Sequence, residues 1–293
     1  MRMKTSLGSK LFDGFNIAFL IALVLITLYP ILYVLFASLS DPTAIATSSG
    51  ILMYPIDFTT EGYKLVFGNP NIWNGFKNTL IYVTLTTFFS LSCTALAAFT
   101  LSRKGPLWNK VVIIMIIITM FFGGGLIPLF LLIKKLGMIN TIWAVVFPSM
   151  ISAYNIIVMK TFFQGISNEL IESAKMDGAN DLTVFFRIVM PLSWAVISVI
   201  GLFYAVGEWN SWFTASIFLR DREMYPLQLY LREILVQNKV DFSMISTSDM
   251  DGIVAMQIIK YAAIIVTTVP ILFVYPFLQK YFVKGVMIGS LKE

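Results

Sequence analysis

The chain has 293 residues, of which 58% are hydrophobic and only 13% are charged. Soluble domains carry about a quarter charged residues, so this composition cannot cover a water-facing surface and excludes an ordinary cytosolic enzyme. One cysteine and no histidine exclude an intrachain disulfide scaffold and every imidazole metal site. The net charge of +5 fits a membrane protein with basic cytoplasmic loops and does not indicate nucleic-acid binding.

Six stretches of 19 residues or more contain no Asp, Glu, Lys or Arg. A helix needs about 20 apolar residues to cross a hydrocarbon core of ~30 Å. Backbone in lipid must satisfy its own hydrogen bonds, and no stretch alternates like a membrane β-strand. The sequence therefore predicts an all-α, polytopic membrane protein with a single transmembrane domain, 1–293, and six transmembrane helices. The predicted spans are 14–40, 78–102, 111–133, 136–159, 188–207 and 261–279.

The first span follows Arg2, Lys4 and Lys10, as the core of a signal peptide does. Its uncharged run of 27 residues is longer than such a core, and no small-x-small cleavage site closes it. We therefore expect this span to be an uncleaved anchor.

Lysine and arginine predict the direction in which the chain crosses the membrane. If the N-terminus is cytoplasmic, the inside segments total 70 residues and hold 12 of the 21 basic residues, while the outside segments total 93 residues and hold nine. Basic residues are then denser inside, as the positive-inside rule requires. Six spans place both termini in the cytoplasm, and the longer segments 41–77 and 214–252 outside.

Helix-breaking residues recur at membrane depth, and two interpretations fit them. They are kinks that neighbouring helices tolerate, or they mark close backbone approach beside a translocation path. The residues concerned are Pro30, Gly123, Gly124, Gly125, Pro128, Pro148, Pro270 and Pro276.

The spans lack the residues that intramembrane chemistry requires. They contain no charged side chain of the kind that binds a coupling ion, and Glu208 lies only near the outer end of the fifth span. No aspartate pair, metal motif or nucleophile with a base is present, which argues against a membrane enzyme. The phosphate-loop motif is also absent, so energy for uphill transport must come from another subunit.

Trp209 and Trp212, which follow Glu208 in the chain, are typical of an interfacial aromatic belt.

The internal segment 163–190 predicts a short helix, a tight turn and a second amphipathic helix. Ser167 or Asn168 can cap the first helix, Gly178 can end it with a positive φ, and Asn180 or Asp181 can cap the second. The apolar residues of the second helix are expected mainly on one face, and these are Leu182, Phe185, Phe186, Val189 and Met190. Such an element suits docking to a partner groove, although a plain interfacial hairpin has the same pattern.

This segment resembles the EAA loop of permease subunits of maltose-type (type I) ATP-binding-cassette (ABC) importers for carbohydrates. Two positions depart from that pattern, because Ser173 replaces an alanine and Met190 replaces a leucine. The residues at the spacing of this pattern are Glu172, Ser173, Ala174, Gly178, Ile188 and Pro191, and Asp177 and Ala179 complete its Asp-Gly-Ala run. Two further segments, Leu136–Thr141 and Lys280–Gly285, resemble maltose-type sugar permeases in general. Glu208–Trp212 and Tyr225–Gln228 resemble the branch for complex oligosaccharides and uronate oligomers such as alginate.

The resemblance implies a non-catalytic permease of the bacterial cytoplasmic (inner) membrane, with the type I importer fold. Its implied partners are a second permease subunit in a heterodimer, two ATPase subunits, an extracytoplasmic solute-binding protein, an oligosaccharide and membrane lipid. This chain then carries no cofactor, since ATP and Mg lie on the ATPase subunits. The helix around Glu172 is expected to enter a cleft on an ATPase, with Gly178 allowing the turn and Phe185, Phe186 and Ile188 anchoring it.

Two questions stay open at this stage. The outer segment 214–252 contacts the solute-binding protein, as in maltose-type permeases, or is uninvolved. The alternative function is a facilitator or channel that works without an ATPase, which the absence of intramembrane charge also permits. The sequence identifies no substrate-binding residue, so the sugar that passes through is left unassigned.

Overall fold

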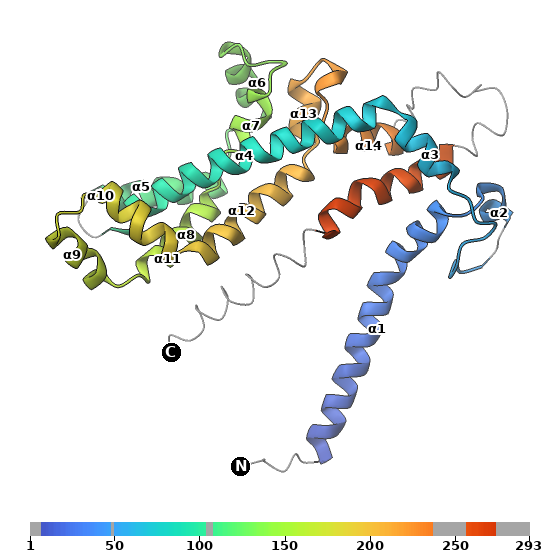
Figure 1. Ribbon diagram of the computed structural model, residues 1–293, viewed down its shortest axis with the longest axis horizontal. Coiled ribbons are helices and arrows are strands. Elements are labelled where there is room, and N and C mark those ends of the chain that lie inside the picture. Colours follow the sequence, from blue (N-terminus) through green and yellow to red (C-terminus); the bar gives the residue numbers. More distant parts are fainter. Residues whose placement is uncertain (1–6, 48–49, 104–107, 237–255, 274–293) are drawn as a thin grey trace. The chain divides into compact units, whose positions relative to one another are not determined.

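The computed structural model describes residues 7–47, 50–103, 108–236 and 256–273 (Figure 1). Regular structure in these ranges is helical, apart from an isolated bridge between Ser40 and Phe58. The first helices are α1 (Leu7–Ser38), α2 (Pro42–Thr47), α3 (Glu61–Gly68), α4 (Pro70–Ser102), α5 (Asn109–Phe121), α6 (Leu126–Lys135), α7 (Trp143–Ser149) and α8 (Ala153–Gln164). They are followed by α9 (Asn168–Met176), α10 (Asp181–Val184), η1 (Phe185–Val189), α11 (Met190–Leu192), α12 (Trp194–Trp209), α13 (Phe213–Phe218), η2 (Arg222–Met224), α14 (Leu227–Val236) and a helix at Met256–Phe273.

The chain divides into two compact units, residues 1–69 with 233–268, and residues 70–232 with 269–293. Within the first unit, Gly62 of α3 lies against the last long helix. A Cβ at this position would stand 2.2 Å from a methyl carbon of Ile258, so a larger residue cannot fit without movement. The hydroxyls of Ser38 and Tyr63 share a hydrogen bond of 2.7 Å, which ties the end of α1 to α3.

The second unit is organised around α4, which packs along α8 and α12 (Figure 1). At 33 residues this helix is about 50 Å long, more than a bilayer core requires. Its buried face carries a row of hydroxyl side chains at helical spacing, Thr79, Thr86, Ser90 and Thr94. Thr94 shares a hydrogen bond of 2.8 Å with the hydroxyl of Tyr204 on α12, which also accepts from the backbone N–H of Ser152.

The membrane-length helices are of two kinds. Three are continuous: Gly8–Ser38, Pro70–Ser102 and Met256–Phe273. Three further spans are pairs bent at a short break: α5 with α6 by 113°, α7 with α8 by 52°, and Asp181–Leu192 with α12 by 83°. With each bent pair taken as one span, the described residues contain six spans, as the sequence predicted.

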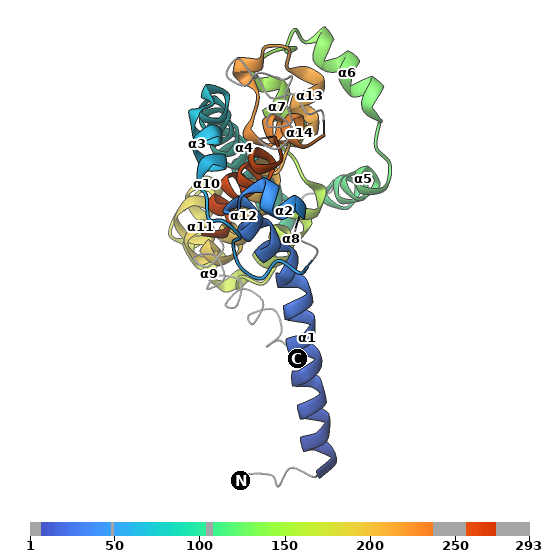
Figure 2. The same ribbon diagram turned by 90° about the vertical axis from the view of Figure 1, so that its right-hand side faces the viewer.

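The sharpest bend, between α5 and α6, falls at the glycine run of the predicted third span (Figure 2). Gly125 has φ +85°, a conformation outside the right-handed helical region. Pro30, in contrast, lies inside the continuous helix α1. The glycine run therefore interrupts its helix, whereas Pro30 does not. The predicted span 111–133 is a broken helix.

Apolar surface lies uncovered on several helices within the described residues. The most apolar window of α1 buries none of its residues inside the chain, and α5 has no buried residue. Aliphatic surface on this scale is stable in lipid or against another subunit, and not in water. Parts of the predicted last span (274–279), of the outer segment (237–252) and of the tail Lys280–Gly285 lie outside the described residues.

Candidate functional site

Helix α9 forms the first half of the predicted loop 163–190. Ser167 caps it, since its Oγ accepts a hydrogen bond of 3.2 Å from the backbone N–H of Glu169. Glu169 in the first turn and Lys175 in the last turn both complement the helix dipole. Of the two caps that the sequence offered, the structure uses Ser167 rather than Asn168.

Gly178 ends α9 with φ +85°. The N–H of Ala179 donates to the carbonyl of Ala174 at 2.9 Å, and the N–H of Gly178 donates to that of Lys175 at 3.0 Å. These two bonds form a Schellman motif, in which the residue after the cap must be left-handed. A Cβ at Gly178 would meet no atom within 4 Å, so the glycine is required by backbone conformation and not by space.

The second half of the loop begins at Asn180, whose Oδ1 accepts 2.8 Å hydrogen bonds from the backbone N–H and the hydroxyl of Thr183. The short α10 then passes into η1, a π-helical turn at Phe185–Val189. Phe185 is buried, whereas Leu182 and Phe186 are each 62% exposed, so the predicted single apolar face is not buried as a whole. The ring of Phe186 still contacts that of Phe185 edge-on, with centroids 4.8 Å apart.

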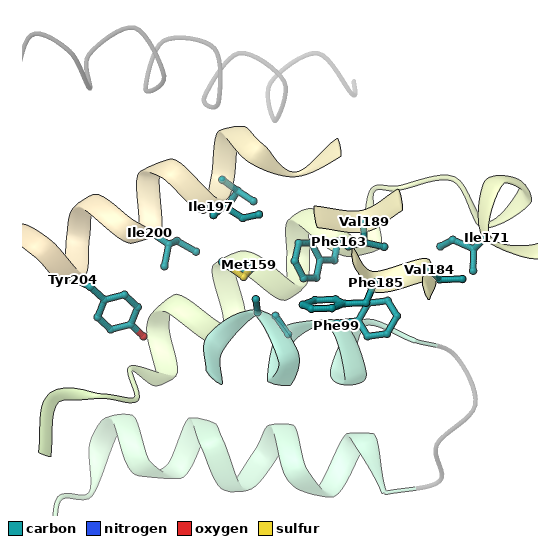
Figure 3. Packing of buried hydrophobic residues seen from close by; sticks show 13 residues of the cluster. Phe99, Met159, Phe163, Ile171, Val184, Phe185, Val189, Ile197, Ile200 and Tyr204 are labelled. Atoms are coloured by element: carbon teal, nitrogen blue, oxygen red, sulfur yellow. The ribbon is translucent and has the colours of Figure 1, made fainter. Parts of the chain in front are cut away.

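The loop has one face packed against the rest of the second unit. Ile171, Val184, Phe185 and Val189 belong to a single apolar cluster with residues of α4, α8 and α12 (Figure 3). Phe185 contacts Phe99 of α4, with ring centroids 5.1 Å apart. The loop is therefore a fixed part of this unit and not a loose connection.

The structure divides the predicted site residues of the loop between its packed and its exposed side. Phe185 is buried, and Ala174, Ala179 and Ile188 are half-buried. The remaining ones are exposed, and these are Glu172, Ser173, Asp177, Gly178 and Pro191. The exposed face also presents apolar side chains, because Leu170 and Met176 are 51% and 89% accessible.

A cavity of about 490 Å³ lies between this loop and the end of α4. Lys175 and Asp181, which line it, form an ion pair of 2.8 Å between Nζ and Oδ1. The lining residues are Leu96, Phe99, Thr100, Arg103, Asn168, Ile171, Glu172, Lys175, Asp181, Leu182 and Phe185. Sequence reasoning missed Arg103, and only its position at the end of an apolar span could have indicated it.

Glu208, near the C-terminal end of α12, is 6% exposed. Its Oε2 accepts a hydrogen bond of 3.2 Å from the hydroxyl of Ser149. Trp209 is also buried and packs against Phe76, with centroids 6.4 Å apart, so it is not part of a lipid-facing aromatic belt. In the part of the chain that the structure describes, no group of three His, Cys, Asp or Glu residues could hold a metal ion.

Residues 65–288 match the family described as binding-protein-dependent transport system inner membrane component. The chain belongs to this family. It is thus a permease of a binding-protein-dependent ABC importer, a non-catalytic transmembrane subunit of the inner membrane. The family carries no cofactor on this subunit, and it implies an ATPase and a binding protein as partners.

The permease is similar to proteins of Bacillus subtilis (strain 168). It is 37% identical to the polygalacturonan/rhamnogalacturonan transport system permease protein YtcP, over 97% of this chain and 99% of that one. It is 38% identical to protein LplC, over 99% and 98% of the two chains. A solved structure of a bacterial ABC transporter involved in the import of the acidic polysaccharide alginate contains a chain with 31% identity and a TM-score of 0.87, covering 95% of this permease and 99% of that chain.

Proposed function

We propose that the α9–Gly178–α10 element is the surface through which an ATPase subunit drives this permease. The observation that carries the proposal is its two-faced structure. One face is fixed to α4, α8 and α12 through Phe185 and its neighbours. Leu170 and Met176 are exposed, and Glu172, also exposed, lines the cavity beside the end of α4. Exposed apolar side chains beside a carboxylate fit a partner cleft that contains a basic residue.

Coupling at this surface is mechanical. A rigid, capped helix transmits displacement better than a flexible loop, and its buried face leads directly into α12 through η1 and α11. Closure of the ATPase pair then biases the helices of the permease between two arrangements. Glu172 forms the ion pair with the ATPase, and Gly178 holds the angle between α9 and α10.

Replacement of Gly178 by Val tests this role. The variant forces a β-branched residue to φ +85°, so the turn changes while the surrounding space stays empty. We expect ATP-driven uptake by the assembled importer in proteoliposomes to fall at least tenfold, with the complex still assembled. Gly68→Val is the matched control, since Gly68 also has open space around it but no positive φ. Uptake at the wild-type rate by the Gly178 variant would show that this turn has no role in coupling.

Uptake without ATP by the wild-type protein would favour the alternative function, a facilitator that works without an ATPase.

We further propose that the cargo is an oligosaccharide that contains uronate units. Support comes from the permease protein YtcP and from the alginate transporter, because the names of both refer to acidic polysaccharides. The test measures uptake of trigalacturonate, an alginate trimer and neutral raffinose by the complete importer with its binding protein. Uptake of either acidic trimer in preference to raffinose is expected. A preference for raffinose would contradict this assignment.

The proposed assembly contains a second permease subunit, two ATPase subunits and a solute-binding protein, with both termini of this chain in the cytoplasm. The uncovered apolar surfaces of α1 and α5 support lipid and a neighbouring permease as their surroundings. Orientation is tested with single cysteines in a Cys93→Ser background. A membrane-impermeant maleimide should label Ser173→Cys only in inside-out vesicles and Asp57→Cys only in right-side-out vesicles. The reverse pattern would invert the topology.

A further inference from the structure

Arg103 lies directly after the last residue of α4, at the cavity described above. Its guanidinium carbon stands 4.5 Å from the ring centroid of Phe99, a cation–π contact that holds the head group in place. Its Nε and Nη2 atoms are buried and have no hydrogen-bond partner among the described residues. A guanidinium has five N–H donors and no acceptor, so buried unpaired donors are unfavourable and call for an anionic partner.

Two carboxylates of the loop line the same cavity, those of Glu172 and Asp181. Asp181 is the first residue of α10, which Asn180 holds in place. Burial lowers the pKa of the Arg103 guanidinium, and the nearby Asp181 charge acts in the opposite direction. The two groups therefore already interact across the cavity without a direct bond.

Asp181 is paired in this structure with Lys175, but this ion pair lies at the surface. The two side chains are 51% and 70% exposed, and exposed pairs of this kind contribute little to stability. Exchanging Lys175 for Arg103 gives Asp181 a planar partner whose paired donors match carboxylate geometry better than the lysine ammonium does. The released lysine stays hydrated.

We propose that Arg103 is a positioning residue for transport: Asp181 exchanges Lys175 for Arg103 when the ATPase pair closes, and the cavity between the loop and α4 collapses around this new ion pair. The proposal rests on the coupling role assigned above to α9–Gly178–α10. It adds a direct link from the loop to the end of α4. A displacement of the loop then reaches α4 directly, through Arg103 at the C-terminal end of that helix, as well as through α12.

Thr100 lines the same cavity and is exposed, which makes it a reporter of closure. The test uses the assembled importer with its ATPases, in a Cys93→Ser, Thr100→Cys background, and measures the rate of maleimide labelling without nucleotide and after trapping with ATP and vanadate. This readout needs no transported sugar. We expect trapping to slow labelling at least fivefold. Arg103→Gln and Asp181→Asn should each remove this protection, and the exchange Arg103→Asp with Asp181→Arg should restore it.

Lys110→Gln is the matched control, because it removes a basic residue at the start of α5 that does not line the cavity. It should keep full protection. Arg103→Lys retains the charge without the planar fork and should give intermediate protection. If Arg103→Gln does not assemble, Arg103→Lys tests whether the protection from labelling depends on Arg103.

Three results would overturn the proposal: no protection in the parent protein, full protection in Arg103→Gln, or no restoration by the charge exchange in an assembled complex. Gly178→Val separates this inference from the coupling role of the loop. If Gly178→Val loses protection while Arg103→Gln keeps it, the loop couples to the ATPase and only the role of Arg103 is wrong. If both keep it, both proposals fail.

Discussion

The ring of Phe99, near the end of α4, lies 5.1 Å from the ring of Phe185 at the start of the π-helical turn, with an angle of 55° between their planes. The two rings connect the central helix of the second unit to the element that we assign to ATPase coupling. Both side chains are buried, at 8% and 3% exposure. The contact explains why the exposed face of the loop has a fixed support.

Phe185→Ala should loosen this support. Truncation of a buried Phe removes its transfer free energy and leaves a cavity, at a cost of about 3–5 kcal/mol. We expect a lower thermal unfolding temperature of the purified complex and weaker ATP-dependent uptake. Phe186→Ala is the comparison, since the Phe186 ring contacts Phe185 but is 62% exposed, and it should lower the unfolding temperature much less. Equal loss in the two variants would contradict the packing described for η1.

Asn180→Ala should fray the start of α10. Loss of an N-cap side chain costs about 1 kcal/mol, and here it also removes the acceptor of the Thr183 hydroxyl. Hydrogen exchange at the amides of residues 182–184 should accelerate about fivefold, with little change in α8. Asn180→Asp keeps a capping oxygen and should retain slow exchange. Rapid exchange in the aspartate variant would show that the cap acts through something other than this acceptor.

Tyr204→Phe should destabilise the contact between α4 and α12. The phenol oxygen accepts from the N–H of Ser152 and shares a hydrogen bond with Thr94, and leaving buried partners unpaired costs about 1–3 kcal/mol. The unfolding temperature in detergent should fall. Adding Thr94→Val should recover part of this loss, because one unpaired hydroxyl is then removed. Tyr54→Phe, at a residue that is 70% exposed, should have no effect.

Asp41 should make the stability of α2 dependent on pH. Its carboxylate accepts hydrogen bonds from the hydroxyl of Thr43 and from the N–H groups of Thr43 and Ala44, which lower its pKa. A group with a lowered pKa stabilises the folded state above its unfolded value, about 3.9, and the contribution is lost as pH falls through the folded value. At pH values below the folded pKa, the amide hydrogens of α2 should be less protected from exchange, after correction for the intrinsic pH dependence of exchange. Asp41→Asn, which cannot titrate, should remove this dependence.

The six spans could be predicted from the sequence because the absence of charge over about 20 residues is a local property that lipid enforces. Their bends could not be predicted in the same way. Gly125 and its neighbours mark the break in the third span, but they do not give its 113° angle or the packing of α6 against α7 and α13 in the cluster of Ile133, Ala144 and Phe218.

The loop shows the same division between local and long-range information. Ser167, Gly178 and Asn180 could be identified because capping depends on residues close in the chain. The exposure of Leu182 and Phe186 depends on which side chains the rest of the second unit covers, and the 3.6-residue periodicity does not indicate this. Nor does that periodicity indicate the π-helical turn at Phe185–Val189. Arg103 reaches the loop only because α4 packs along α8 and α12, a contact between distant parts of the chain.

The empty space around Gly178 separates chirality from size at this turn. An L-residue is disfavoured there by its own backbone, at about 1–2 kcal/mol, and no neighbouring atom excludes a methyl group. A D-alanine introduced by chemical ligation prefers the mirror-image conformation and should therefore support the turn at least as well as glycine does. The requirement at this position is for handedness, and a side chain of the opposite configuration satisfies it.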